Sequence, residues 1–339
     1  MIKNITIKKI YEESLAISNG DGLVAPLGIK ENGEIEYVDY SKINHLIVCG
    51  TSGSGKTTFV RTLLMSLMLT STPENFKLCI FDSKHIDYTD FNGMPFLLLP
   101  VATDSKKCPA MIGWLSHEAE RRQKIFADTG NIDELPNVFV ILDDYAEIDH
   151  DLYTQENIYK LLQIAHRVKI HVIIVTSIAL AKIISTELKV NIPHRISFFL
   201  PERRNSQVVI DQDGAESLEF PGEFIAKFYS KTKTLRSIEL SNSEIKEFFD
   251  IAKSETKRNA SFEKVIFDFK KVDAPEEDPL YNEAVQVVMA AGIASTSLLQ
   301  RQLKIGYARA ERIINEMEAK GVIGAYDGIK PRKVLINNT

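Results

Sequence analysis

The stretch "HLIVCGTSGSGKTTF", residues 45–59, decides the fold that we predict for this chain. Its first five residues have the apolar character of a buried strand, and a helical pattern of residues continues beyond its end. Between them, Gly50 is followed after four residues by Gly55, Lys56 and Thr57. This spacing matches the phosphate-binding loop, a motif that is specific when a strand precedes it and a helix follows it.

The residue types of the loop suit a nucleotide. Glycines let the backbone curl until successive N–H groups converge on a β-phosphate, and the start of a helix adds its dipole. A lysine at position 56 reaches the β- and γ-phosphates, and a threonine at 57 ligates Mg²⁺. We therefore predict ATP and Mg²⁺ as cofactors; a Gly/Ser-rich turn that binds nothing is the alternative. The predicted binding residues are Gly50, Thr51, Ser52, Gly53, Ser54, Gly55, Lys56, Thr57 and Thr58.

Acidic residues follow two further strand-like runs. Asp143 ends "VFVILD" (138–143), where an acid holds Mg²⁺ through water, and Asp144 occupies the place of a water-activating carboxylate. The alternative for Asp144 is a helix cap or a loop acid. Asp82 ends "FKLCIFD" and either lines the same crevice or closes a turn. Ser177, after another apolar run, either senses the γ-phosphate or begins a loop.

Short apolar runs alternate with helical patterns through the first 240 residues, which predicts an α/β fold with a central, mostly parallel sheet. The predicted strands are 45–50, 76–82, 137–143, 171–177 and 194–200, and the predicted helices are 56–70, 105–128 and 154–168. We expect four parts along the chain. They are a mixed α/β segment (1–44), a P-loop nucleotide-binding domain (45–250), a charged linker (251–279) and a small winged-helix domain (280–339).

Composition limits the class of protein. In 339 residues, 44% are hydrophobic and 26% charged, as in ordinary globular proteins. The three cysteines lack metal-ligand spacing, and Cys49 and Cys79 lie in apolar runs, which indicates reduced core thiols. The chain has no secretory signal pattern and no apolar run of about 18 residues. These features predict a cytoplasmic protein without membrane contact in this chain.

The C-terminal 60 residues have the features of a nucleic-acid reader. They hold eight Lys/Arg and five Asp/Glu, whereas the rest of the chain is acidic. The helix 308–322 has an apolar face, and its other side bears cations near the N-terminus, where a recognition helix contacts bases. A hairpin at 325–336 would meet phosphates. The predicted contacts are Arg309, Arg312, Asn315, Lys330, Arg332 and Lys333. A protein-binding winged helix or an ordinary solvated helix face is the alternative.

With these motifs in one order, the chain resembles the FtsK/SpoIIIE family of double-stranded DNA translocases. Stretches like the family's motor are "HLIVCGTSGSGKTT", "MPFLLLPVATDSKK" (94–107), "EAERRQKIFA" (118–127), "VNIPHRISF" (190–198) and "IDQDGAESL" (210–218). Stretches like its winged-helix γ domain are "DPLYNEAVQVV" (278–288), "STSLLQRQLKIGYARAERIINEMEAKGVIG" (295–324) and "DGIKPRKVL" (327–335).

The resemblance implies a RecA-like ATPase that forms a hexameric ring around duplex DNA. It further implies ATP sites between subunits and a γ domain that sets direction by reading short DNA sequences. The resemblance also implies a further partner, either a site-specific recombinase or a septum protein. The implied catalytic residues are Lys56, Asp143, Asp144, Ser177, Arg203 and Arg204.

Departures from the family pattern predict slow hydrolysis or relocated catalytic groups. Asp144 stands where the family has Glu, Ser177 where it has Gln, and Gln207 where it has Arg, so Arg203 and Arg204 are the candidates for a cation supplied in trans. In the reading helix, Ala308 replaces Asn and Asn315 replaces Glu, whereas Arg312 is kept.

These departures leave a nucleotide-controlled DNA-binding protein with weak or no motor activity as the alternative function. A conjugative coupling ATPase would lack the γ-like segment. The family's N-terminal membrane region has no counterpart in the sequence, which fits a piece of a longer protein or a stand-alone motor of the kind that phages and mobile elements carry.

Overall fold

The apolar runs form the central strands of one large sheet, as predicted. The computed structural model describes residues 5–18, 23–104, 107–148, 152–256, 278, 280–324 and 332–335. By its internal contacts the chain divides into two units, Met1–Phe267 and Asp268–Thr339, and each is described by itself. The four-part division at residues 44, 250 and 279 stays a prediction.

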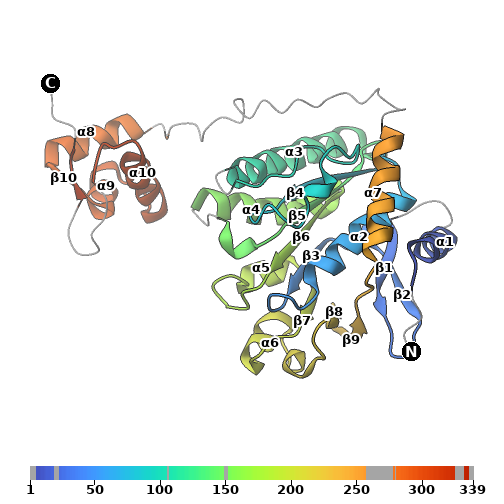
Figure 1. The fold of residues 1–339 in the computed structure, drawn as a ribbon. Helices are drawn as coiled ribbons and strands as arrows, with labels where there is room; N and C mark the ends of the chain where they lie inside the picture. The colour runs from blue at the N-terminus through green and yellow to red at the C-terminus, as the bar shows by residue number, and fades with distance from the viewer. Residues whose placement is uncertain are drawn as a thin grey trace. The chain divides into compact units, whose positions relative to one another are not determined.

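The first unit is built on a nine-stranded sheet in the order β2-β1-β9-β8-β7-β3-β6-β5-β4 (Figure 1). Five neighbouring strands, β7-β3-β6-β5-β4, run parallel, and the remaining pairs are antiparallel. The strands are β1 Val24–Ile29, β2 Ile35–Asp39, β3 His45–Cys49, β4 Phe76–Phe81, β5 Asn137–Leu142, β6 Ile170–Thr176, β7 His194–Phe198, β8 Glu223–Phe228 and β9 Lys231–Arg236. The α/β fold class and the five predicted parallel strands are confirmed.

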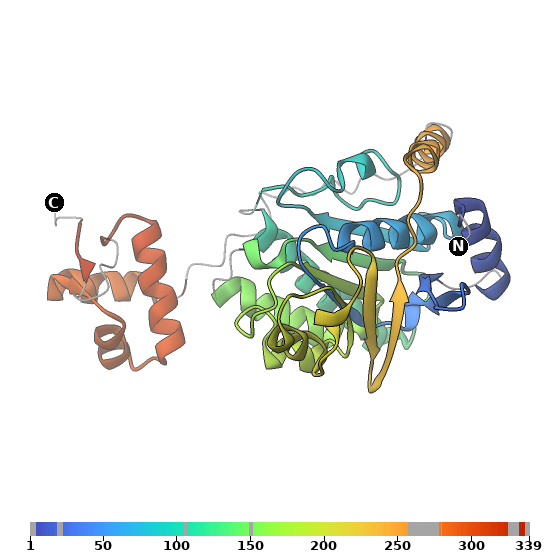
Figure 2. The same ribbon diagram turned by 60° about the horizontal axis from the view of Figure 1, so that its bottom comes forward.

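Helices cover both faces of this sheet, which gives three layers (Figure 2). On one face, α1, α2 and α7 contribute to a core with the side chains of Leu46 and Val48; on the other, α3 to α6 pack against Ile47 and Cys49. The helices are α1 Ile7–Ser18, α2 Lys56–Thr70, α3 Cys108–Thr129, α4 Leu152–Ile164, α5 Thr186–Asn191, α6 Arg203–Ile210 and α7 Asn242–Thr256. Because alternate strand residues enter opposite cores, both faces of each parallel strand are buried, which explains their continuous apolar runs.

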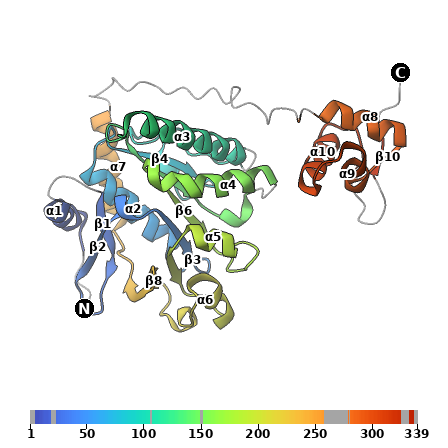
Figure 3. The same cartoon turned by 180° about the vertical axis from the view of Figure 1, so that it is seen from behind.

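The predicted helices agree with the structure to within a few residues. The helix predicted at 56–70 is α2, the one at 105–128 is α3, and the one at 154–168 is α4 followed by a 3-10 turn, η4 (Ala165–Val168); Figure 3 shows α3 and α4 side by side. The other 3-10 turns are η1 Tyr40–Lys42, η2 Thr89–Phe91, η3 Tyr145–Glu147 and η5 Ala215–Ser217. The three cysteines are free and buried, as predicted. Among the described residues, no helix is both long and apolar enough to cross a bilayer.

The second unit is a small helical domain with its own core. It contains α8 Tyr281–Ala291, β10 Ile293–Ala294, α9 Thr296–Leu303, α10 Tyr307–Ala319 and β11 Arg332–Lys333, and β10 pairs antiparallel with β11. Ala310, Ile313, Ile314 and Met317 of α10 are buried in this core, so the predicted apolar face is confirmed. Of the hairpin predicted at 325–336, residues 325–331 and 336 lie outside the described residues.

Candidate functional site

The predicted nucleotide-binding residues gather where the parallel strands end. Register pairs Cys49 with Thr176, and Phe81 with Leu142, so the segments after β3, β4, β5 and β6 all leave the same edge of the sheet. Ligands of open α/β sheets bind at this edge. The structure therefore brings the phosphate loop (residues 50–57), Asp82, Asp143 and Ser177 to one end of the sheet.

The phosphate loop forms a cradle that only glycine permits at two positions. A Cβ on Gly50 would lie 2.5 Å from Cβ of Phe198 on β7, so the backbone passes too close for any side chain. Gly55 has φ +110°, and its Cβ would lie 3.2 Å from the Phe198 ring. The N–H of Thr51 donates to the carbonyl oxygen of Phe199 at 3.0 Å, and Ser54 accepts from the N–H of Gly222 at 3.0 Å. These bonds fix the loop to the segment that follows β7 and to the segment that precedes β8.

Lys56 begins α2 and folds back over the loop. Its Nζ donates to the carbonyl oxygens of Gly50 at 2.8 Å and Thr51 at 2.9 Å, and the side chain is buried, which lowers its pKa. Helix α2, which is described in full, has no acidic residue in its first turn. A buried cation at a helix start without a competing carboxylate fits the phosphates of a nucleotide.

Three carboxylates meet beside this loop. Oxygens of Asp82, Asp87 and Asp143 all lie within 4.8 Å of one another. Burial, with a smaller contribution from the nearby acids, raises the pKa of Asp143 to about 7, and the hydrogen bond from the Asp144 N–H opposes this rise. Clustered carboxylate oxygens are the ligands that Mg²⁺ prefers, so the donor set fits the predicted metal.

Asp82 closes a turn, which is one of the two alternatives left open for it. Its carboxylate accepts from the N–H groups of Lys84, Asp87 and Tyr88 at 3.0 to 3.2 Å, and its side chain is fully buried. These three bonds hold residues 83–88 against the end of β4.

Asp144 is held by two residues of that turn. Lys84 Nζ lies 2.8 Å from its Oδ1, and Ser83 Oγ donates to its Oδ2 at 3.3 Å. The backbone of Asp144 is left-handed (φ 49°) and its side chain is almost wholly buried. The hydrogen bond to Asp144 raises the pKa of Lys84. Glu147, in η3, is exposed.

The other predicted catalytic residues lie at the surface. Ser177 is exposed just after β6, whereas Thr176 is buried and its Oγ1 accepts from the N–H of Ile178 at 3.1 Å. Arg203 pairs with Asp213, and Arg204 with Glu202; both arginines begin α6 and are about three-quarters exposed, at 73% and 77%. Gln207 also bonds Asp213, at 2.8 Å. The catalytic roles of these residues stay predictions.

In the second unit, three of the predicted DNA contacts, Arg309, Asn315 and Arg332, are engaged within the chain. Arg309 forms a two-bond pair with the buried carboxylate of Asp278, at 2.7 and 3.0 Å, which joins the start of α8 to α10. Arg332 pairs with Glu318 at 2.9 Å and lies 3.4 Å from Asn315 Oδ1. Asn315 and Lys333 are exposed. Lys330 and the side chain of Arg312 lie outside the described residues.

Sequence reasoning missed Ser83, Lys84 and Asp87. The one available signal was "FDSKHID" (81–87), an acid-ended strand followed by a cation and a second acid. Their importance depends on β4 lying next to β5, a pairing that brings Lys84 to Asp144. Because 55 residues separate the two strands along the chain, local sequence does not give that pairing.

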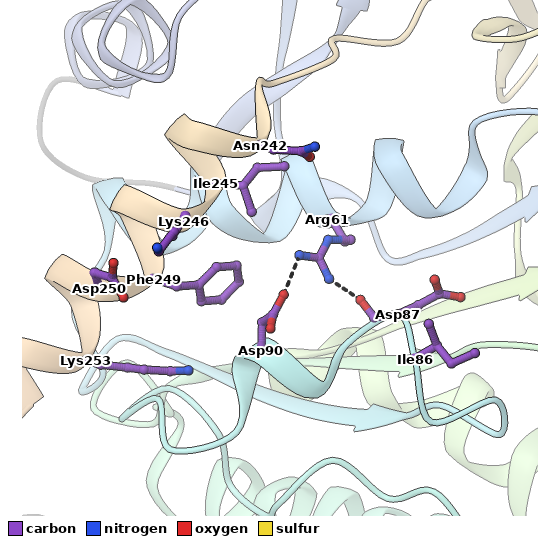
Figure 4. Close-up of a pocket in the computed structure, with 10 residues that line it drawn as sticks. All are labelled: Arg61, Ile86, Asp87, Asp90, Asn242, Ile245, Lys246, Phe249, Asp250 and Lys253. Atoms are coloured by element: carbon purple, nitrogen blue, oxygen red, sulfur yellow. Dashed lines mark hydrogen bonds and ion pairs between the residues drawn. The ribbon is translucent and has the colours of Figure 1, made fainter.

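A cavity of about 490 Å³ lies behind the same turn, between α2, residues 86–90 and α7 (Figure 4). Arg61 of α2 donates to the backbone oxygen of Asp87 and pairs with Asp90 at 3.1 Å. Its guanidinium also lies 5.8 and 5.7 Å from the ring centres of Phe91 and Phe249. The turn that carries Lys84 is thus held from α2 as well as from β4.

Comparisons with known proteins match both units. The model of the FtsK/SpoIIIE family matches residues 7–219, and that of the Ftsk gamma domain matches 275–337. The DNA translocase FtsK of Caldanaerobacter subterraneus subsp. tengcongensis is 32% identical over 99% of this chain and 50% of that protein. The DNA translocase SpoIIIE of Bacillus subtilis is 32% identical over 98% of this chain and 45% of its own length. The chain thus spans about half the length of these relatives.

Solved structures share the fold of the first unit. The pCW3 conjugation coupling protein TcpA, solved with ATPgS, is 19% identical, with a TM-score of 0.60 over 68% of this chain and 71% of that one. The EssC ATPases 2 and 3 of Geobacillus thermodenitrificans are 18% identical, with a TM-score of 0.60 over 70% of this chain and 49% of theirs. At such identities the likeness shows the fold alone.

Proposed function

The chain belongs to the FtsK/SpoIIIE family, and from that premise we propose that it is an ATP-dependent translocase of double-stranded DNA. The observation that carries the proposal is the meeting of Lys56, the glycine cradle and the acids around Asp143 at one edge of the sheet. A second unit like the Ftsk gamma domain, on the same chain, supports DNA as the track. We retain residues 45–250 as the motor, 1–44 as its lead-in, 251–279 as the linker and 280–339 as the DNA-reading domain.

In this proposal the phosphate loop, residues 50–58, holds the phosphates of ATP. Lys56 leaves the carbonyl oxygens of Gly50 and Thr51 for the β- and γ-phosphates, because their charge is a stronger partner than two carbonyl groups. Thr57 and Asp143 hold Mg²⁺, which neutralises charge on the phosphates when bound. Asp82 and Asp87 add negative charge near it.

Hydrolysis then depends on residues of two subunits. Asp144 accepts a proton from the attacking water. Ser177 is the proposed sensor of the γ-phosphate. Arg203 or Arg204 enters the site of a neighbouring subunit in a hexameric ring, since both are exposed at the start of α6. We name a site-specific recombinase or a septum protein as the further partner of the ring.

The second unit meets DNA through α10 and β11. Arg312 and Asn315 are the proposed base contacts, and Lys330, Arg332 and Lys333 the proposed phosphate contacts. Because Arg309 pairs with Asp278, we propose that it stabilises the fold of the second unit. Arg309 contacts DNA only if this ion pair opens.

The test is ATPase activity of the full chain with and without long duplex DNA. We expect DNA to stimulate hydrolysis, and Lys56→Ala to reduce it to background while the circular dichroism spectrum is unchanged. Wild-type turnover in Lys56→Ala would remove this loop from the reaction. A rate of ATP hydrolysis that duplex DNA does not change would contradict translocation.

A nucleotide-controlled DNA-binding protein is the second candidate. It is favoured by Gln207, which occupies the place of the family's arginine and bonds Asp213 of its own chain. This candidate predicts nucleotide-dependent assembly on DNA with no stimulated hydrolysis, so the same assay separates the two functions.

A further inference from the structure

The carboxylate of Asp144 has partners for both of its oxygens, and both partners come from one turn. Lys84 Nζ lies 2.8 Å from Oδ1, and Ser83 Oγ lies 3.3 Å from Oδ2. The carboxylate is buried, with 10% of the side chain exposed, whereas 55% of the Lys84 side chain is exposed. Two partners on different oxygens restrict rotation of the carboxylate about its χ2 torsion, which is otherwise broad.

The turn that presents these partners is itself fixed from two sides. Asp82 accepts from three backbone N–H groups of the turn, including that of Lys84. On the far side, Arg61 of α2 bonds the backbone oxygen of Asp87, and Figure 4 shows Arg61 pointing between Asp87 and Asp90. Since α2 also begins with Lys56, the phosphate loop and the turn are joined through one helix.

We propose that Lys84, assisted by Ser83, is a positioning residue that aims the carboxylate of Asp144 during hydrolysis. The inference rests on the proposed function, in which Asp144 takes the proton of the water whose oxygen bonds to the γ-phosphorus as the bond to ADP breaks. Aspartate has one methylene group fewer than the glutamate usual in the family, so its carboxylate reaches less far and gains more from a fixed orientation. Lys84 stays a cation throughout and exchanges no proton.

A direct role of Lys84 on the nucleotide is the competing possibility, because its exposed side chain is close enough to Lys56 for their charges to interact. The structure favours positioning, since Nζ is within hydrogen-bonding distance of Asp144. The two roles differ in kinetics. Loss of a phosphate ligand weakens binding of ATP, whereas loss of a positioning group slows turnover and leaves binding in place.

The experiment compares Lys84→Met with Lys30→Met in the full chain on duplex DNA. Lys30 is a matched control: it pairs with Glu36 at 3.0 Å and is 39% exposed, but it lies on the β1–β2 hairpin. We expect Lys84→Met to lower kcat by about 10-fold to 100-fold, the cost of misplacing a reacting group by about 1 Å. KM and the Kd of a fluorescent ATP analogue should change little, and Lys84→Arg should restore part of kcat.

A double mutant distinguishes positioning from a general structural loss. Asp144→Asn should turn over slowly, and adding Lys84→Met to it should cause no further loss, because the two residues act through one group. Ser83→Ala is the milder second variant if Lys84→Met does not fold, and it should lower kcat less.

Three results overturn the inference: wild-type kcat in Lys84→Met, a raised Kd with unchanged kcat, or losses that multiply in the double mutant. A wild-type chain without ATPase activity would overturn the proposed function, and this inference with it. A wild type that hydrolyses ATP beside an unaffected Lys84→Met would overturn only the inference.

Discussion

Three histidines lie at the starts of three adjacent strands, at the edge of the sheet opposite the phosphate loop. Burial lowers the pKa of His45 to about 3 and those of His171 and His194 to about 4. His45 and His171 each bond through both ring nitrogens, His45 to Leu162 and Val172, and His171 to Ile43 and Asn137. Neutral His45 satisfies both contacts, because Nε2–H donates to the Leu162 oxygen and Nδ1 accepts from the Val172 N–H. Both partners of His171 are oxygen atoms, so its neutral ring donates to only one of them.

His194 differs, because neither ring nitrogen has a hydrogen-bond partner among the described residues. Its ring contacts Phe228 and Tyr229, and 1% of the residue is exposed. A buried polar group without a partner costs about 1–3 kcal/mol. We therefore expect His194→Leu to raise the free energy of unfolding by about that amount, and His45→Leu to lower it, because two backbone groups would lose their partner.

The same histidines predict a pH dependence of stability. Between pH 6.5 and about 4 the unfolded chain binds protons that the folded histidines do not, so the contribution of the histidines to the free energy of unfolding falls as pH falls through this window. The raised pKa of Asp143 contributes with the opposite sign. Each histidine contributes at most about 1.4 kcal/mol per pH unit. The charges facing His171 are Asp39, which favours its protonation, and Arg122, which opposes it; His166 and His171 oppose that of His45.

Denaturant titrations at pH 7.5 and 5.5, followed by the fluorescence of the single tryptophan, Trp114 on α3, measure both effects. Because His194→Leu removes one titrating group, it should reduce the slope of the free energy of unfolding against pH by at most about 1.4 kcal/mol per pH unit. An unchanged pH dependence in that variant would mean that His194 does not stay neutral, or is not buried, in the folded chain.

At the scale of elements, the polar residues of helix α10 have two different roles, stabilising the fold and contacting DNA. The sequence alone does not distinguish the two. An exposed helix face with several cations predicts DNA contact for each of them, but the structure pairs Arg309 with a carboxylate that is 1% exposed. Removing Arg309 takes a counter-charge away from a buried carboxylate, which is destabilising. Arg309→Met should therefore lower the thermal stability of the second unit and leave its sequence preference among DNA duplexes intact.

Lys333 and Arg312 serve as the comparison, in the full chain. Lys333 is exposed on β11. Its replacement by Met should weaken binding to all duplexes alike and reduce the slope of log K against log[salt] by about one. Arg312→Ala should flatten sequence preference and cost about 1–3 kcal/mol on the preferred duplex. A selection from random duplexes with all three variants tests the division. If Arg309→Met alters the selected sequence, Arg309 reads bases and its pair with Asp278 opens on DNA.

The elements that the sequence predicted and those that it missed differ in a physical way. Strands β3 to β7 of the parallel part are buried on both faces, so their apolar runs are recognisable locally. Strand β9, "KTKTLR", is exposed at its first four positions and lacks that pattern, so the antiparallel extension of the sheet was not predicted. The phosphate loop and Asp143 were predictable from spacing, whereas the contact of Lys84 with Asp144 depends on sheet order.

At the scale of the whole molecule, a ring makes each site depend on a neighbour. Rings close by heterologous contacts, in which different surfaces of successive subunits meet. We expect a hexamer on duplex DNA with an ATP analogue, visible by electron microscopy or analytical ultracentrifugation. A stable dimer under those conditions would contradict the ring.

Mixing two inactive variants tests whether the trans cation comes from α6. Lys56→Ala lacks a working phosphate loop but keeps the arginines of α6; a variant with Arg203→Ala and Arg204→Ala has the reverse defect. The arginines pair only with Asp213 and Glu202 in the described chain, at an exposed surface where ion pairs are weak, so both are available to a neighbour. Each variant alone should be inactive on DNA. Random mixing in equal amounts should restore roughly a quarter of the sites, because one neighbour order in four joins an intact loop to intact arginines. Activity that stays at background in the mixture, with both variants still binding DNA and assembling, would mean that the cation acts within its own subunit or comes from another element.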